Sequence, residues 1–117
     1  ERRGEERITV QDPQRYLSHR HSDLVLKAEI VDMNFFGVLL ELEPGLTDQA
    51  AAYPRDLALH LEDEEGEFKI ECLIFEHDGT QLRALFKHGS FDVAERLLRF
   101  VQKEKAIQQA EVFDAVI

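Results

Sequence analysis

The sequence predicts a small antiparallel β-barrel of about six strands, closed by one α-helix near the C-terminal end. Segments that alternate apolar and polar residues fill most of the chain from residue 24 to residue 86, as expected for strands with one buried face. Glycine, proline and charged turn signals separate these segments. After Gly89 the apolar residues recur at helical spacing instead. Because 117 residues are enough for one hydrophobic core, we expect a single domain over residues 1–117.

Residues 23–43 predict two strands with a break between them. Apolar residues occupy every second position from Leu24 to Ile30, and the alternation resumes from Val38 to Leu42. The stretch DMNFFG, residues 32–37, interrupts this pattern and ends in glycine, so we expect a turn or bulge there. The polar segment before it, RYLSHRHSD, is expected to be a linker, which places the barrel at residues 22–89.

The second half of the predicted barrel contains three further strands. Residues 43–56 hold two prolines and a glycine and are expected to form a loop. Alternation returns over residues 57–62, and the charged turn DEEGE leads into a further alternating segment, residues 68–74. The pair Asp78-Gly79 predicts a tight turn into the last strand, QLRALF, because type I′ geometry needs positive φ at both central positions.

A helix is predicted over residues 90–110. Ser90 can cap it, and Asp92 and Glu95 place carboxylates in the first turn, where they complement the helix dipole. Apolar residues at positions 94, 97, 98 and 101 form one stripe that can lie against the sheet. The last residues, EVFDAVI (111–117), form an apolar tail that could pack on the barrel, on a partner or on a neighbouring domain.

Charge and composition restrict the kinds of partner. The net charge of −10 opposes general binding to DNA, RNA or anionic membranes, so an anionic ligand would have to be small and held by local cations. No apolar run is long enough to insert across a membrane, and no signal-peptide pattern precedes the first strand. Cys72 lies in an alternating apolar pattern and is expected to be a buried thiol of a reduced, cytoplasmic protein.

The sequence shows none of the common catalytic or metal-binding motifs. It lacks GxSxG, HExxH, a CxxC pair and a glycine-rich phosphate loop. His19 and His21 are close in sequence, but they lie in a polar segment without a carboxylate or thiol partner at ligand spacing. We therefore expect no enzymatic activity, no metal site and no cofactor.

Two motifs are not explained by packing. The first is RxxxR, formed by Arg3 and Arg7 and directly preceded by Arg2. The second is DxNxxG, at the break between two strands, formed by Asp32, Asn34 and Gly37. Taken singly, the first motif would be a solvated charged tail and the second a plain turn. Their joint occurrence, with this order, separation and strand context, is a pattern that a known family shares.

This arrangement resembles the PilZ domain family of bacteria. The start ERRGEERI looks like the family's common start, and an N-terminal arm (residues 1–10), a motif turn, an antiparallel barrel and a closing helix follow in the family's order. The resemblance covers most of the chain and implies a receptor for the second messenger cyclic di-GMP. The ligand-binding residues that it implies are Arg2, Arg3, Arg7, Asp32, Asn34 and Gly37. Asn34 stands where the family usually has serine.

The chemistry of cyclic di-GMP fits these residue types. The guanidinium groups of Arg3 and Arg7 can donate paired hydrogen bonds to phosphate or to the O6/N7 edge of guanine, and they can stack on a purine. The Asp32 carboxylate can accept from the N1–H and N2–H donors of guanine, and Gly37 lets backbone approach the ligand. A mobile free arm would close on the nucleotide and present a new surface to a downstream protein or neighbouring domain.

Several alternatives remain open at this point. Arg2 is either a terminal charge or, as the family pattern implies, a third cation for two intercalated ligand molecules. One of Phe35 and Phe36 is expected to point into the barrel, and the other either borders the ligand or covers apolar surface. The rival function is a PilZ-like interaction module that no longer binds nucleotide. The output pathway, a homodimer, and a larger or membrane-tethered parent protein are also left open.

Overall fold

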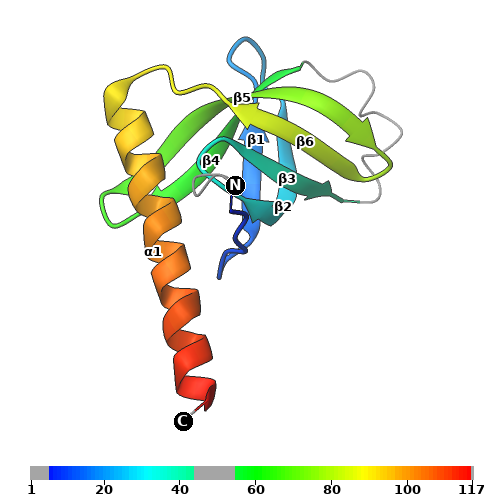
Figure 1. Cartoon of the computed structure of the whole chain (residues 1–117). Helices are drawn as coiled ribbons and strands as arrows, with labels where there is room; N and C mark the ends of the chain where they lie inside the picture. The colour runs from blue at the N-terminus through cyan, green and yellow to red at the C-terminus, as the bar shows by residue number, and fades with distance from the viewer. Residues whose placement is uncertain (1–5, 44–54, 117) are drawn as a thin grey trace.

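The structure, a computed structural model, describes the backbone of residues 6–43 and 55–116 and the side chains of residues 6–43 and 55–110. The strands in these ranges are β1 Gln14–Ser18, β2 Val25–Met33, β3 Gly37–Leu42, β4 Asp56–Asp63, β5 Gly66–Asp78 and β6 Gln81–Phe86. They are followed by the helix α1, Phe91–Val116. Figure 1 shows the strands wrapped into a barrel and α1 leading away from it.

Within the described ranges the strands form one closed barrel in the order β1-β2-β3-β6-β5-β4. Every neighbouring pair is antiparallel, and the pairing of β1 with β4 closes the barrel. β3 lies between β2 and β6, so the start of β3 is adjacent to the end of β6. The predicted fold class, an antiparallel β-barrel with a C-terminal helix, is confirmed (Figure 1).

Two element boundaries differ from the expected ones. The barrel begins at Gln14 rather than at residue 22, because the segment interpreted as a polar linker contains β1. This strand buries Leu17 while the residues beside it stay at least partly exposed, so its alternation is too short to recognise in the sequence. The helix continues to Val116, so residues 111–116 are helical where a separate tail was expected. Most of the predicted loop over residues 43–56 lies outside the described residues.

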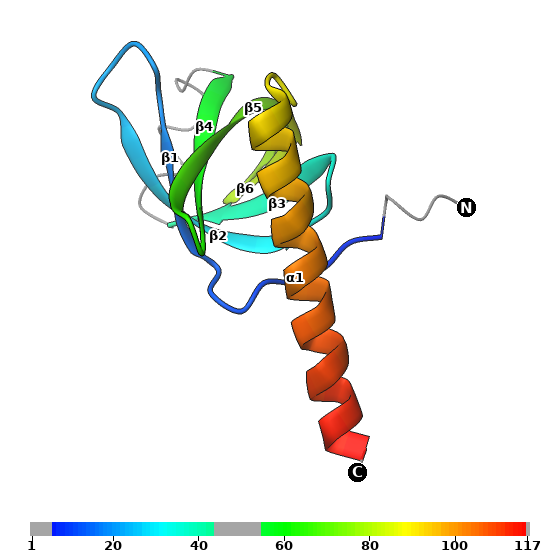
Figure 2. The ribbon, with the colours of Figure 1, turned by 90° about the vertical axis from the view of Figure 1, so that its left-hand side faces the viewer.

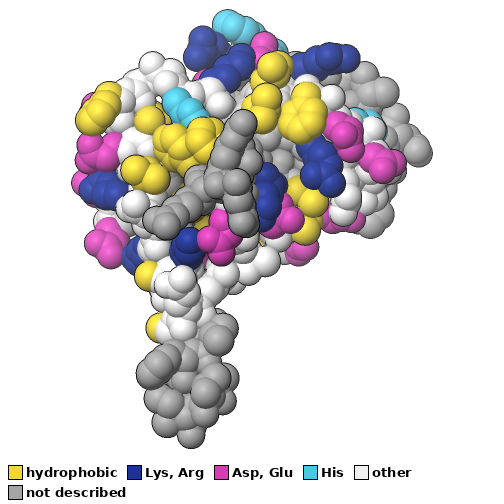
Figure 3. Space-filling view, in the orientation of Figure 1, with side chains coloured by type: hydrophobic (Ala, Val, Ile, Leu, Met, Phe, Trp, Pro, Cys, Tyr) yellow, Lys and Arg dark blue, Asp and Glu magenta, His cyan; other side chains and the backbone are white. Residues whose placement is uncertain are grey.

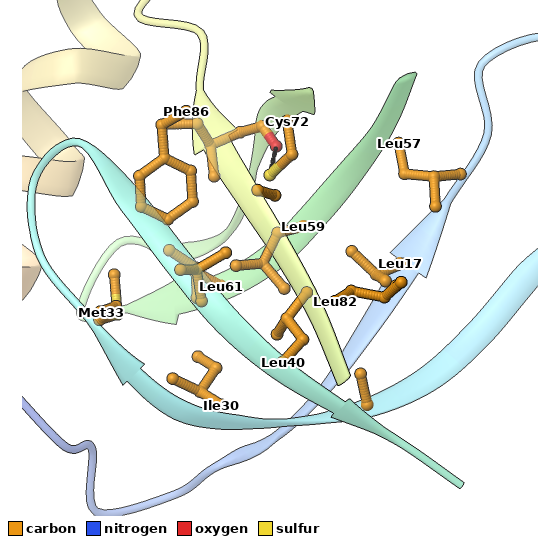
Figure 4. Packing of buried hydrophobic residues seen from close by; sticks show 14 of the residues in the cluster. Leu17, Ile30, Met33, Leu40, Leu57, Leu59, Leu61, Cys72, Leu82 and Phe86 are labelled. Atoms are coloured by element: carbon orange, nitrogen blue, oxygen red, sulfur yellow. Dashed lines mark hydrogen bonds between the residues drawn. The ribbon is translucent and has the colours of Figure 1, made fainter. Parts of the chain in front are cut away.

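Aliphatic side chains from all the strands of the barrel fill its interior (Figure 4). Leu17, Leu40 and Leu59, from three different strands, are fully buried, and each such side chain contributes roughly 1.5–3 kcal/mol by leaving water. Cys72 lies in the same core, and its thiol donates to the carbonyl oxygen of Ile70 at 3.5 Å. Burial raises the pKa of the Cys72 thiol to about 12. The prediction that Cys72 is buried is confirmed.

The first half of α1 covers one end of the barrel. Leu97 and Phe100 are buried in the hydrophobic core. Arg96 fixes the helix to the β4–β5 hairpin, since its Nε and Nη2 donate to the Asp63 carboxylate at 2.8 and 2.6 Å. The Arg96 guanidinium also lies 4.5 Å from the centre of the Phe68 ring. The rest of α1 extends past the barrel (Figure 2). In the part of the chain that the structure describes, α1 included, no helix has the length and apolar character needed to cross a membrane.

Candidate ligand-binding site

The described end of the arm is fixed to the end of β2. Ile8 and Met33 exchange two backbone hydrogen bonds, each N–H donating to the other residue's carbonyl oxygen at 2.8 Å. The Ile8 side chain is buried in the core. The arm that was expected to be mobile therefore has an apolar anchor, Ile8, in its described part.

This bridge places Arg7 beside Asp32, the first residue of the motif turn (residues 32–37). Arg7 Nε donates to Asp32 Oδ1 at 2.6 Å, and Arg7 Nη2 donates to the Asp32 carbonyl oxygen at 3.3 Å. The two side chains remain 39% and 32% exposed, so a ligand can reach both. A cation and an anion predicted from separate motifs are thus in contact. The other predicted cations, Arg2 and Arg3, lie outside the described residues.

Asn34 holds the motif turn together from the inside. Its Oδ1 accepts hydrogen bonds from the N–H groups of Phe36 at 2.8 Å and Gly37 at 2.9 Å. Its own N–H donates to the Gly37 carbonyl oxygen at 3.0 Å. Asn34 is 5% exposed, and this pattern of bonds is one that asparagine commonly uses to stabilise a turn. Asn34 therefore shapes the turn from which Asp32 and Phe36 project.

Gly37 is required by the packing of two strands. A Cβ atom at this position would lie 2.7 Å from the carbonyl oxygen of Ala84 on β6, closer than real side chains come. The φ angle of Gly37 is not positive, so the turn itself does not demand glycine here. The residue instead allows β3 and β6 to approach each other closely.

A hollow of about 280 Å³ opens beside the motif turn, and we call it the Arg7 hollow. The arm and the motif turn contribute Arg7, Asn34, Phe36 and Gly37 to its lining. The rest of the lining comes from Phe75 of β5 and from residues 83–85 of β6. Small-molecule pockets are commonly about 300–1,000 Å³, so the Arg7 hollow can hold part of a dinucleotide rather than all of it.

The sequence motifs did not identify the β5 and β6 residues of this lining. Phe75, Arg83 and Leu85 belong to strands whose alternation is clear, but their side chains face outward, where alternation predicts no role. The sequence feature that could have identified them is the presence of large apolar residues, Phe75 and Leu85, at strand positions that face outward. Figure 3 shows hydrophobic and basic side chains next to each other over β5 and β6 on this face.

The two phenylalanines of the motif turn have different surroundings. Phe35 packs against the core, and its ring stacks on His88 with 4.2 Å between centroids and 8° between planes. His88 Nε2 also donates to the Phe35 carbonyl oxygen at 2.7 Å. Phe36 is half exposed and lines the Arg7 hollow. Of the two, Phe36 is therefore the one placed to border a ligand.

No protein-family model and no curated protein sequence matches the chain. Solved structures with a similar backbone include the following two. The PilZ domain of YcgR from Escherichia coli, solved with c-di-GMP, matches with a TM-score of 0.65 and 16% identity over 96% of this chain and 98% of that chain. An uncharacterised protein from Legionella matches with a TM-score of 0.60 and 12% identity over 89% of this chain and 98% of that chain. The chain has the PilZ fold.

Within this PilZ fold, the described arm pairs with the end of β2, and the motif turn joins β2 to β3. The β5 and β6 residues then complete the wall of the Arg7 hollow. Among the described side chains, those of residues 6–43 and 55–110, no group of three or more His, Cys, Asp or Glu is placed to hold a metal ion. The groups present at this PilZ-fold site are the guanidinium groups of Arg7 and Arg83, the Asp32 carboxylate and exposed apolar side chains.

Proposed function

We propose that the chain is a cyclic di-GMP receptor domain that relays ligand binding to a partner protein or a neighbouring domain. The observation that carries the proposal is the contact between Arg7 and Asp32, which come from two distant motifs and lie beside one hollow of a PilZ fold. The PilZ domain of YcgR, solved with c-di-GMP, supports the ligand class. The role is recognition and signalling, and it needs no catalytic step.

Arg7 and Asp32 offer complementary groups to a guanine nucleotide. The Arg7 guanidinium carries five N–H donors in a planar fork, which suits phosphate or the O6/N7 edge of guanine. The Asp32 carboxylate suits the N1–H and N2–H donors on the other edge. An exposed ion pair is worth about 0.2–1 kcal/mol, so the ligand can replace the contact between Arg7 and Asp32 at small cost. Arg2 and Arg3 are the proposed additional cations.

The arm also contacts α1, and this contact offers a route from the site to the surface (Figure 2). Glu6 forms an ion pair with Lys105 at 2.7 Å, and Gln108 Nε2 donates to the carbonyl oxygen of Thr9. Arg7 lies between Glu6 and Thr9 in the chain, so its movement toward a ligand would alter the contacts between the arm and α1. This change is the proposed conformational switch.

Isothermal titration calorimetry with cyclic di-GMP tests the proposal. The wild type should bind, and Arg7→Ala should weaken binding about tenfold or more, because a hydrogen bond to a charged group is worth about 1.5–3 kcal/mol. Arg99→Ala is the matched control, since Arg99 is a half-exposed arginine on α1 that does not line the Arg7 hollow. Absence of binding by the wild type would overturn the proposal.

The stoichiometry of the same titration distinguishes one ligand molecule per site from an intercalated pair. Two molecules bring four phosphates and four guanines into one site, which would require more cations than Arg7 alone. We expect Arg2→Ala to reduce the stoichiometry if Arg2 holds the second molecule. An unchanged stoichiometry and affinity would assign Arg2 to the solvated end of the chain.

The second candidate is a protein-interaction module that no longer binds nucleotide. It is favoured by Asn34, which uses its side-chain oxygen to close the motif turn and stands where the PilZ resemblance implies serine. NMR titration separates the two functions. Unchanged signals of Arg7 and Phe36 on addition of cyclic di-GMP, with binding to a protein partner retained, would select this second candidate.

A further inference from the structure

The β6 residues that line the Arg7 hollow lie beside Gly37, the first residue of β3. Arg83 and Leu85 are two positions apart on β6, so their side chains leave the same outer face, while Ala84 between them is buried. In the β3–β6 ladder, Leu85 pairs with Gly37. Any side chain at position 37, opposite Leu85, would occupy part of the hollow. The glycine that the strand packing requires therefore also leaves room for a ligand beside Arg83 and Leu85.

Phe75 lies at a β-bulge and lines the same hollow. The pairing of β5 with β6 shifts register between Ile74 and Glu76, which places Phe75 at the irregularity. Ile74 packs against the core, whereas Phe75 is more than half exposed and lines the Arg7 hollow. A large ring held outside the core contributes little to folding, and exposed apolar patches mark interaction sites.

The composition of the lining selects among ligand classes. Phe36, Phe75 and Leu85 line the hollow and are 47%, 54% and 49% exposed, and the guanidinium groups of Arg7 and Arg83 line it with them. An apolar peptide would not need the two cations, and a free phosphate would not need the rings. A nucleotide uses both, because its bases stack on aromatic faces and its phosphates accept charge-assisted hydrogen bonds.

Arg83 forms an exposed ion pair with a carboxylate that a phosphate can replace. Arg83 Nε lies 3.4 Å from Glu76 Oε1, and both side chains are about half exposed. An exposed pair at this distance contributes little to stability. The Glu76 carboxylate therefore competes with an anionic ligand for the same guanidinium without fixing it in place.

We propose that Arg83 and Phe75 are ligand-binding residues of this domain, outside both sequence motifs. Arg83 donates to a phosphate or to the O6/N7 edge of a guanine, and Phe75 stacks on a base. Glu76 weakens binding by competing for Arg83. This inference rests on the proposed function, since it assigns additional contacts to the same nucleotide.

Calorimetry with cyclic di-GMP on three variants tests these contacts. Arg83→Ala should weaken binding about tenfold or more, and Arg83→Lys should restore only part of the loss, because lysine keeps the charge but not the planar fork. Phe75→Leu keeps an apolar side chain but removes the aromatic face, and it should weaken binding about fivefold or more. Thermal unfolding by circular dichroism checks that each variant folds.

The chain offers matched controls for both residues. Arg20 is an exposed arginine that, like Arg83, pairs with a glutamate of β5, its Nη2 lying 3.3 Å from Glu71 Oε1. Phe91, at the start of α1, is an exposed phenylalanine outside the hollow. Arg20→Ala and Phe91→Leu should leave the affinity for cyclic di-GMP unchanged.

Glu76→Gln adds a test in which binding of cyclic di-GMP should become tighter rather than weaker. Removing the competing carboxylate should tighten binding about two- to fivefold, whereas Glu71→Gln should not, since Glu71 pairs with Arg20 instead. If the wild type binds and the Arg83, Phe75 and Glu76 variants all bind like it, the inference is wrong and the proposed function stands. If the wild type does not bind, both are wrong.

Discussion

Arg7 and Asp32 are 25 positions apart in the chain, yet Arg7 Nε lies 2.6 Å from Asp32 Oδ1. The contact follows from the backbone bridge between Ile8 and Met33, which aligns the arm with the end of β2. Both charged side chains are accessible, so their pairing adds little to stability. The proposed role of the two residues in ligand binding can therefore be tested separately from folding.

Replacing Asp32 should therefore separate binding from stability. We expect Asp32→Ala to weaken binding of cyclic di-GMP about tenfold or more, and to change the free energy of unfolding by less than about 1 kcal/mol. Calorimetry and urea denaturation measure the two quantities. Asp12→Ala is the control, because Asp12 is an exposed carboxylate whose Oδ2 lies 3.9 Å from Arg15 Nη1, and this variant should change neither quantity. A large loss of stability in Asp32→Ala would instead make Asp32 a structural residue.

Gly37 provides a test of the contact between β3 and β6. The Cβ of Gly37→Ala would meet the Ala84 carbonyl oxygen at 2.7 Å, so one of the two strands must shift. We expect a loss of about 1–3 kcal/mol in the free energy of unfolding, measured by urea denaturation. Gly89→Ala is the matched control, because a Cβ there meets no atom within 4 Å. Equal stability of the two variants would show that β3 and β6 can separate without cost.

Substitutions of Asn34 test whether its side-chain oxygen stabilises the motif turn. In Asn34→Ala the N–H groups of Phe36 and Gly37 lose the oxygen that accepts from both, so we expect the free energy of unfolding to fall by about 1–3 kcal/mol. Asn34→Ser keeps a side-chain oxygen and should lose less than the alanine variant. Chemical denaturation ranks the three proteins, and a serine variant as unstable as the alanine variant would contradict this account of the turn.

Long alternating segments made most of the barrel predictable from the sequence. β2 buries every second residue, and β4 buries leucines at alternate positions from Leu57 to Leu61; such a pattern has few alternatives to a strand with one face in the core. β1 was missed because its burial depends on pairing with β2 and β4 rather than on its own composition, in which Leu17 stands among polar and aromatic residues. The end of α1 was misplaced because apolar residues can continue a helix as well as form a tail.

The candidate site was predictable only in part, because strand pairing places some of its residues. Arg7 and Asp32 belong to motifs with fixed local spacing, so the sequence could propose their meeting. Arg83 and Phe75 reach the same hollow through the β3–β6 ladder and the bulge in β5, which are properties of strand register. A single sequence does not specify that register.

The Cys72 thiol should be protected in the folded protein. Burial raises its pKa to about 12, and thiol reagents attack the thiolate, so reaction near neutral pH requires the barrel to open. We expect little reaction with a disulfide reagent under native conditions and rapid, stoichiometric reaction in urea. A fast native reaction would show that the strand carrying Cys72 opens locally, without global unfolding.

The contact between α1 and the β4–β5 hairpin predicts a loss of stability in acid. Hydrogen bonding by Arg96 holds the pKa of the Asp63 carboxyl below its ordinary value of 3.8. A carboxyl whose pKa is lowered by folding stabilises the protein above its unfolded-state pKa, and this contribution is lost as the pH falls through the lower folded-state pKa. We therefore expect the Asp63–Arg96 contribution to be complete at neutral pH and to decline below about pH 4.

Asp63→Asn isolates this contribution. The variant should be less stable than the wild type at neutral pH, and the difference should shrink as the pH falls from about 5 to about 2, measured by urea denaturation at each pH. In an Arg96→Gln background the same substitution should have a smaller effect, because the main hydrogen-bond partner of Asp63 is already gone. If the difference between wild type and Asp63→Asn stays constant down to about pH 2, ionisation of Asp63 does not hold α1 on the barrel.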